Sequence, residues 1–158
     1  MPARTYFTHA DSPFGRLLLT SDGTALTGLY LSDRRPEPDW VRDAVPFAQV
    51  TAELTDYFAG RLTAFTVPLA PAGTPFQKRA WDALKAIPYG QTVSYAEQAR
   101  MIGRPTASRA VGSANGKNPI SVVIPCHRVV ASGGGLGGYG GGLPMKARLL
   151  ELEQHGGW

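Results

Sequence analysis

The segment PLAPAG, residues 68–73, divides the chain into two stretches of different character. It is followed at once by Thr74-Pro75-Phe76-Gln77. A capping hydroxyl, a proline at the first helical position and a glutamine at the third mark the start of a helix. Apolar runs broken by turns precede the segment, and helical patterns follow it. We therefore predict an α/β (α+β) protein with a sheet domain over residues 1–70 and a mostly helical domain over residues 74–158.

The first stretch predicts strands followed by one helix. Asp11-Ser12-Pro13 and Asp22-Gly23 interrupt the apolar runs of residues 4–31, and an Asp-Gly pair is a strong hairpin signal. Residues 48–60, AQVTAELTDYFAG, then carry apolar side chains at helical spacing and end on Gly60, a favourable C-cap.

The second stretch has the pattern of a helix-turn-helix. The first helix should run from Thr74 to about Ala86. A second capping box, Ser94-Tyr95-Ala96-Glu97, begins a short helix through about Met101. A turn at residues 103–105 separates it from another helix over residues 106–115. That last helix is rich in small residues, which suits either close packing in the protein or a narrow DNA groove.

Three further elements are expected towards the C-terminus. The β-branched run ISVVI, residues 120–124, predicts a buried strand, and residues 129–131 predict another. A glycine-rich loop over residues 132–142 then leads into a helix from Leu143 to about Gln154.

Charge and composition narrow the function classes. Residues 1–70 carry six Lys/Arg and eight Asp/Glu, whereas residues 71–158 carry ten and four. This asymmetry indicates either a polyanionic partner for the second stretch or ordinary solvated charge. No run of eighteen apolar residues occurs, so we expect no membrane segment, and we find no secretory signal. A single cysteine forms no internal disulfide, so we expect a cytoplasmic protein with a reduced thiol.

That cysteine, Cys126, lies in IPCHRVV, residues 124–130. One cysteine and three scattered histidines give no zinc-ligand spacing, so we expect no metal.

Cys126 is either a small apolar filler or a nucleophile, half-exposed at the end of the predicted strand. A free thiol is roughly 3% ionised at pH 7, so a nucleophile needs a base. His127 is the candidate, acting through a water because adjacent side chains of an extended chain diverge. Glu151 or Glu153 would orient the ring.

IPCHRVV, with Asn118-Pro119 upstream and a glycine-rich loop containing Tyr139 downstream, closely resembles the O6-alkylguanine-DNA alkyltransferases. This family is also called the methylated-DNA–protein-cysteine methyltransferases. Residues 74–99 are similar to the opening of its catalytic domain, and residues 107–119 to its recognition helix and asparagine hinge. The resemblance implies a ribonuclease-H-like N-terminal sheet domain and a C-terminal winged-helix/helix-turn-helix domain.

The resemblance also implies an activity, which is direct-reversal DNA repair. An alkyl group would move irreversibly from O6 of a flipped-out guanine to Cys126, once per molecule and without a cofactor. The partner would be double-stranded DNA carrying O6-alkylguanine, met through the minor groove by a monomer. Some relatives bind zinc through N-terminal cysteines, which this chain lacks.

Residue roles follow from the same resemblance. His127 would deprotonate Cys126 through a water, Glu153 would orient the imidazole, Asn118 would brace the turn, and Tyr95 would donate to the departing guanine. The substrate would further meet Tyr139 as a pocket wall, the carbonyl of Val129, the N–H of Gly140, and Lys146 near the proton relay. Arg109 would fill the gap left by the flipped base. The other residues expected on the DNA are Ala107, Ser108, Ala110, Gly112, Ser113 and Arg128.

Two other functions compete with repair. A winged-helix DNA-binding module without chemistry explains the charge asymmetry but leaves IPCHRVV unused. A Cys-His hydrolase needs an oxyanion hole, which the glycine-rich loop could supply, but it leaves the DNA-type helix unused.

Overall fold

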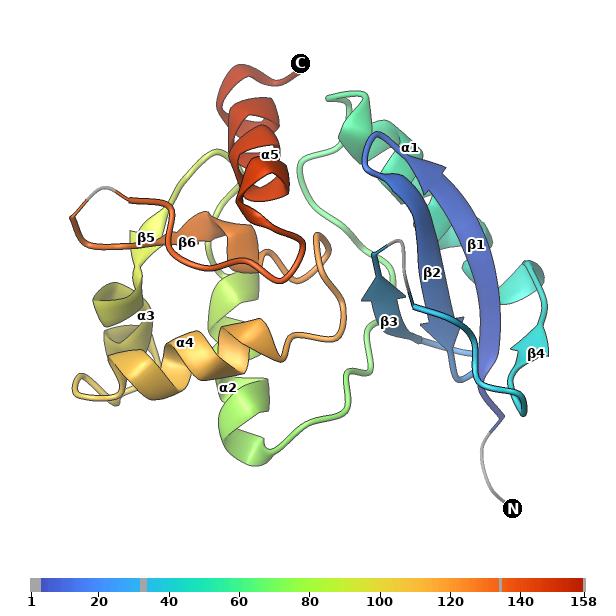
Figure 1. Cartoon of the computed structure of the whole chain (residues 1–158), viewed down its shortest axis with the longest axis horizontal. Helices are drawn as coiled ribbons and strands as arrows, with labels where there is room; N and C mark the ends of the chain where they lie inside the picture. The colour runs from blue at the N-terminus through green and yellow to red at the C-terminus, as the bar shows by residue number, and fades with distance from the viewer. Residues whose placement is uncertain (1–3, 32–33, 134, 158) are drawn as a thin grey trace. The chain divides into compact units, whose positions relative to one another are not determined.

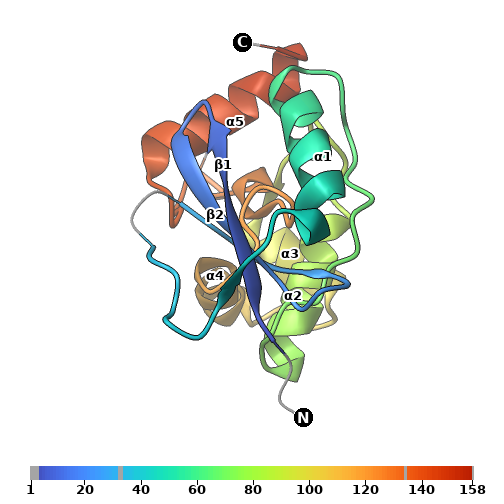
Figure 2. The same cartoon turned by 90° about the vertical axis from the view of Figure 1, so that its right-hand side faces the viewer.

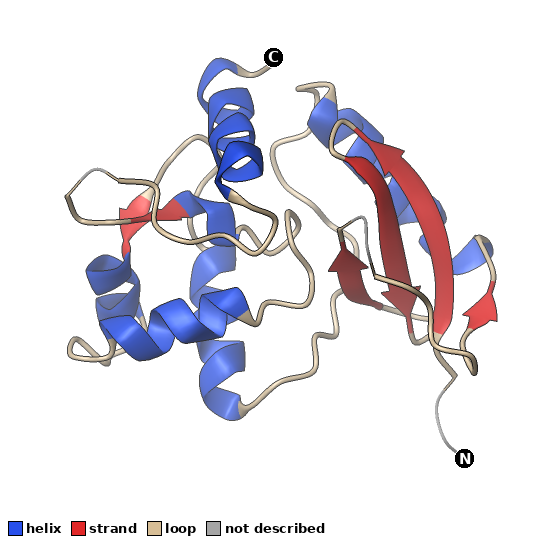
Figure 3. Cartoon of the chain, in the orientation of Figure 1, coloured by secondary structure: helices blue, strands red, loops and turns tan. Residues whose placement is uncertain are grey.

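The computed structural model describes residues 4–31, 34–133 and 135–157. The chain divides into two compact units, one of Met1–Ala72 with Pro119–Ser121 and one of Gly73–Asn118 with Val122–Trp158 (Figure 1). The long strands belong to the first unit, and most helices belong to the second (Figure 3). The predicted mixed α/β fold, with an N-terminal sheet domain and a C-terminal helical domain, is confirmed.

The first unit is built on a four-stranded sheet of order β3-β2-β1-β4. Its strands are β1 (Tyr6–Ser12), β2 (Gly15–Ser21), β3 (Leu26–Tyr30) and β4 (Val41–Arg42). The pairs β1–β2 and β2–β3 are antiparallel, and β4 joins β1 in parallel. The Asp-Gly hairpin forms as expected. Asp22 Oδ1 accepts from the N–H groups of Thr24 and Ala25, both at 2.9 Å, and Gly23 takes a φ of +101°.

One helix, α1 (Ala48–Phe58), lies along this sheet (Figure 2). It follows a 3₁₀ turn at Val45–Phe47 and buries the apolar residues that the sequence placed at helical spacing, namely Val50, Leu54, Tyr57 and Phe58. On β2, Leu17 and Leu19 are buried as well, so helix and sheet share an apolar core.

The second unit contains α2 (Pro75–Lys85), α3 (Tyr95–Met101), α4 (Ser108–Gly116) and α5 (Leu143–His155). A short parallel pair of strands, β5 (Val93–Ser94) and β6 (Val129–Val130), completes it. Both predicted capping boxes are present. The hydroxyls of Thr74 and Ser94 accept from the N–H of the third helical residue, and their own backbone N–H groups donate to the side-chain oxygen of that residue.

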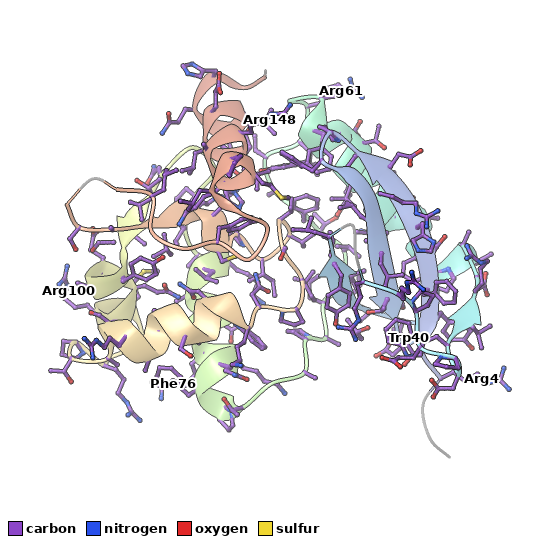
Figure 4. The ribbon with its side chains drawn as sticks, viewed as in Figure 1. Arg4, Trp40, Arg61, Phe76, Arg100 and Arg148 are labelled. Atoms are coloured by element: carbon purple, nitrogen blue, oxygen red, sulfur yellow. The ribbon has the colours of Figure 1, made fainter. Side chains whose placement is uncertain are left out.

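Buried polar contacts fix α2, α3 and α4 against one another. Trp81 Nε1 on α2 donates to the carbonyl of Ala114 on α4 at 2.8 Å. Gln98 on α3 and Asn115 on α4 exchange two amide hydrogen bonds, at 2.9 and 2.7 Å, and Gln98 also donates to Ala80 on α2. Phe76 packs against an apolar cluster of Ala83, Ala99, Ile102 and Val111 (Figure 4). The helix-turn-helix therefore has a rigid base.

The strand predicted for ISVVI is wrong. Residues 121–123 form a turn, and Val122 has a φ of +72°, which is unusual for a β-branched residue. The carbonyl of Pro119 accepts from the Leu29 N–H in the first unit, whereas residues from Val122 onward belong to the second. Only the first residue of the run pairs with the sheet, because Ile120 forms a single parallel bridge with Leu29 of β3. Residues 122–124 are apolar because they are buried in the second unit. Within the described residues, no helix is long and apolar enough to cross a bilayer.

Candidate active site

Cys126 lies in a tight turn, not at the end of a strand. Residues Cys126–Arg128 form one turn of 3₁₀ helix, in which the N–H of Arg128 donates to the carbonyl of Pro125 at 3.0 Å. The expected half-exposure is also wrong, because Cys126 is only 9% exposed. The turn removes the geometric objection raised by an extended chain, since side chains one residue apart no longer point to opposite faces.

The thiol forms part of the wall of a cavity of about 220 Å³. The cavity brings together four residues expected around the substrate: Cys126, Tyr95, Tyr139 and Gly140. Gly112, expected on the DNA side, also lines it. Every lining residue belongs to the second unit. A nucleophile in such a cavity can meet a substrate the size of a small ring while water is largely excluded.

The surroundings of the thiol act on its ionisation in opposite directions. Burial raises the pKa of Cys126 above its ordinary value. A hydrogen bond from the Asn118 side chain and the positive charge of Lys146 oppose this shift in part. Asn118 Nδ2 also donates to the carbonyl of Ile124 at 2.8 Å, so this residue braces the chain just before the reactive turn. The thiol is therefore protonated at rest and requires a base to react.

His127, the candidate base, is buried and held by a carboxylate. Its side chain is fully buried, and its Nε2 lies 2.7 Å from Oε2 of Glu153 on α5. In the described part of the chain, the other ring nitrogen, Nδ1, has no hydrogen-bond partner. Burial lowers the pKa of His127, the Glu153 carboxylate raises it, and the charges of Arg128 and Lys146 lower it. The imidazole is thus neutral near pH 7. Of the two carboxylates predicted to orient it, Glu153 contacts the ring and Glu151 is exposed.

Arg128 does not lie where the sequence placed it. We expected this side chain on the DNA, but it is 7% exposed and its guanidinium faces inward. Nε and Nη2 donate to the two oxygens of Glu153 at 2.7 and 3.0 Å, and Nη1 donates to the carbonyl of Ile87 at 2.7 Å. A guanidinium occupied in this way is not available to a phosphate, so the expectation of a DNA contact is corrected.

Lys146 is buried and links the glycine-rich loop to Val129, the residue that follows the Cys126–Arg128 turn. Its Nζ donates to the carbonyl of Val129 at 2.6 Å and to that of Gly138 at 3.1 Å. Burial lowers the pKa of this lysine, and the nearby sulfur of Cys126 raises it. The carbonyl of Val129 therefore already accepts one hydrogen bond, and Val129 does not line the cavity. Lys146 holds the loop and adds positive charge near the thiol.

The small residues of α4 form an accessible surface. Arg109, Ala110 and Ser113 are exposed, whereas Ala107 and Ser108 at the beginning of the helix are half-buried. Further cations lie in the same unit, among them Arg100 on α3, which is exposed (Figure 4). A helix face without bulky side chains lets a partner come close to the backbone.

Two residues that line the cavity were not predicted to do so: Asn115 and Gly116. Asn115 and Gly116 follow Gly112 by three and four positions, so helical spacing alone could have placed them on the same face. Gly138 also lines the cavity, in line with the expectation that glycines of this loop let the backbone approach a flat base.

Comparisons with known proteins point to one family. The family model for the DNA-binding domain of 6-O-methylguanine DNA methyltransferase matches residues 75–155, and that for its ribonuclease-like domain matches residues 5–71. The methylated-DNA–protein-cysteine methyltransferase of Mycobacterium leprae is 50% identical over 148 residues, covering 92% of this chain and 90% of that protein. Its counterpart in Methanosarcina acetivorans is 47% identical over 152 residues, covering 94% and 97%. The crystal structure of Mycobacterium tuberculosis OGT in complex with DNA matches with a TM-score of 0.92 and 47% identity, covering 96% and 94% of the two chains.

Proposed function

The chain belongs to the 6-O-methylguanine DNA methyltransferase family, as its sequence predicted, and from this premise we propose that it repairs DNA by direct reversal. It transfers a methyl or other alkyl group from O6 of guanine to the sulfur of Cys126. The observation that carries the proposal is a buried thiol on a cavity wall, next in sequence to a buried histidine held by a carboxylate.

The damaged base enters the cavity after leaving the DNA stack. An O6 atom inside a duplex is out of reach of a buried thiol, so the nucleotide flips, at a cost of a few kcal/mol. Tyr95 and Tyr139 flank the space on which Cys126 opens. The glycines of the lining, among them Gly138 and Gly140, allow a flat ring to approach the backbone. Gly140 N–H is the proposed donor to O6.

The transfer is a displacement at the alkyl carbon. His127 Nδ1 takes the thiol proton through a bridging water, and the sulfur forms a bond to carbon as the bond from carbon to O6 breaks. The electron pair of that bond passes into the guanine ring, which takes up a proton, and Tyr95 is the proposed donor. Asn118 and Lys146 stabilise the thiolate that forms, because one donates a hydrogen bond to the sulfur and the other places a positive charge nearby.

The product at sulfur is a thioether, which is a poor leaving group. Because the chain has no second cysteine to accept the alkyl group, each molecule reacts once. No cofactor takes part in this sequence of steps.

DNA is met through α4. Its exposed small residues, Ala110 and Ser113, suit the narrow minor groove, and Arg109 is the side chain proposed to fill the space of the flipped base. The protein acts on double-stranded DNA as a monomer. The cytoplasmic location expected from its single thiol remains a prediction.

Intact-mass measurement after incubation with O6-methylguanine duplex DNA tests the proposal. The expected result is a gain of one methyl group, assigned to Cys126 by peptide mapping and absent in Cys126→Ser. If the wild-type protein binds this DNA and gains no mass, repair is refuted and a DNA-binding module without chemistry takes its place.

A further inference from the structure

Arg128 is a buried charge that the proposed reaction does not yet use. Its three hydrogen bonds join three separate segments: the reactive turn, the Glu153 carboxylate on α5, and the carbonyl of Ile87 just after α2. Its guanidinium also lies 5.8 Å from the centre of the Tyr89 ring. Removing a charged side chain from water to this extent costs free energy, unless an ion pair and hydrogen bonds offset the lost hydration.

The partner that depends on it is Glu153. Both carboxylate oxygens accept from the guanidinium, and Oε2 also faces Nε2 of His127 at 2.7 Å. An ionised carboxylate only accepts hydrogen bonds, so the short contact to His127 requires a proton on Nε2. In a neutral imidazole the remaining nitrogen, Nδ1, then carries the lone pair.

We propose that Arg128 is a positioning residue, which keeps Glu153 ionised and thereby fixes His127 in the tautomer whose basic nitrogen is Nδ1. The proposal deepens the proposed function, on which it rests for the identity of the base. It also assigns the orphaned Nδ1 of the buried ring its task, which is to take the thiol proton.

Without the guanidinium, the hydrogen bond between His127 Nε2 and Glu153 forms with the donor and the acceptor exchanged. A buried carboxyl beside a neutral ring takes up a proton and donates its O–H to Nε2. The imidazole proton then moves to Nδ1, which becomes a donor and can no longer accept from the thiol. The ring stays in place, but the base is lost.

Other charged and titratable groups nearby do not replace Arg128. Lys146 also faces His127, but its Nζ donates to the carbonyls of Val129 and Gly138. Tyr89 and Tyr139 face Glu153, and neither carries a positive charge. Arg128 alone among these groups donates to both carboxylate oxygens, and its planar fork fits that geometry in a way that an ammonium does not.

Three variants test the proposal. Arg128→Met removes the charge and keeps much of the side-chain length, Arg128→Lys restores a charge, and Glu153→Gln leaves Arg128 in place. In Glu153→Gln the guanidinium, which only donates, attracts the oxygen of the new amide and turns its NH₂ group towards Nε2 of His127, which again reverses the tautomer. Arg61→Met is a matched control, because Arg61 pairs with Asp56 at 3.0 Å on the exposed surface of the first unit.

The direct readout is the tautomer of His127, observed by correlating its ring protons with ¹⁵N-labelled ring nitrogens and assigned with His127→Gln. The wild type, Arg128→Lys and Arg61→Met should show a proton on Nε2. Folded Arg128→Met and Glu153→Gln should show it on Nδ1. An Nε2 proton in both of these variants overturns the proposal, and Glu153→Gln decides alone if Arg128→Met does not fold.

The second readout is the single-turnover rate of methyl transfer as a function of pH. Because a general base contributes roughly 100-fold or more, Arg128→Met and Glu153→Gln should lose about that factor with unchanged affinity for DNA. Arg128→Lys should recover part of the loss, because the ammonium keeps the charge but not the planar fork. If Arg128→Met, Arg128→Lys and Glu153→Gln all transfer the methyl group at the same rate, the proposal is overturned. If the wild type transfers no methyl group, the proposed function fails, while the tautomer measurement still tests Arg128.

Discussion

Gly137 lies where the glycine-rich loop passes Tyr95, and a side chain there would require Tyr95 to shift. A Cβ atom at this position would lie 2.6 Å from the Tyr95 hydroxyl oxygen and 3.0 Å from Cε2 of its ring. The residue also has a φ of +73°, a conformation that costs an L-residue about 1–2 kcal/mol. Gly137→Ala therefore combines this backbone strain with overpacking, for which about 1–3 kcal/mol is typical, and should cost roughly 2–5 kcal/mol in all.

The expected outcome is a lower free energy of unfolding and a slower transfer, because Tyr95 forms part of the cavity wall and must move to make room for the alanine side chain. Urea denaturation measures the first effect and single-turnover kinetics the second. Gly133→Ala in the same loop is the control, because a Cβ there meets nothing within 4 Å and this exposed residue is not part of the cavity wall; we expect a change within about 0.5 kcal/mol.

Removing the hydroxyl tests the cause. Gly137→Ala in a Tyr95→Phe background should recover part of the lost stability, since the contact at 2.6 Å disappears and the ring contacts at 3.0 and 3.2 Å remain. If Gly137→Ala is as stable and as reactive as Gly133→Ala, the loop does not pass Tyr95 as described, and this description of the cavity wall is refuted.

Three further predictions concern DNA, pH and the buried amides. Arg109→Ala should slow transfer from duplex DNA by at least about tenfold and leave transfer from free O6-methylguanine unchanged, because only flipping is impaired; parallel rate measurements decide this. Burial lowers the pKa of His127, so the unfolded chain binds that proton more readily, and stability should fall as pH drops below about 6.5. His127→Gln should flatten this fall in urea denaturation across pH. Gln98→Ala should cost about 1–3 kcal/mol in the same assay, because it leaves the buried amide of Asn115 without its partner.

The helices could be predicted because their signals are local. Thr74 and Ser94 each form a capping box with a residue three positions ahead, and this pattern is complete in the sequence. The run at residues 120–124 failed for the opposite reason. Its apolar content is the same for a strand and for a buried turn. Only its start pairs with β3, where the Leu29 N–H donates to the carbonyl of Pro119, and a contact between residues so far apart in the sequence leaves no local signal.

The site was predictable in its chemistry but not in its full geometry. A lone cysteine beside a histidine left Cys126 open between a filler and a nucleophile, and the later helix offered either Glu151 or Glu153. Only the resemblance to the alkyltransferases selected Cys126, His127 and Glu153. The inward turn of Arg128 was not predictable, because an arginine next to a DNA-type motif is equally suited to a phosphate. Its direction is decided by Glu153, 25 residues away, and by the 3₁₀ turn that the pattern did not predict.

The central claim is that the sulfur of Cys126 receives the alkyl group and keeps it. Titrating a fixed amount of protein with excess O6-methylguanine duplex DNA, and counting repaired guanines, tests it most directly. We predict a yield that stops at one repaired guanine per active molecule, with every reacted chain carrying a thioether at Cys126. Repair that continues past this equivalence, or a methyl group on any other residue, would contradict the account.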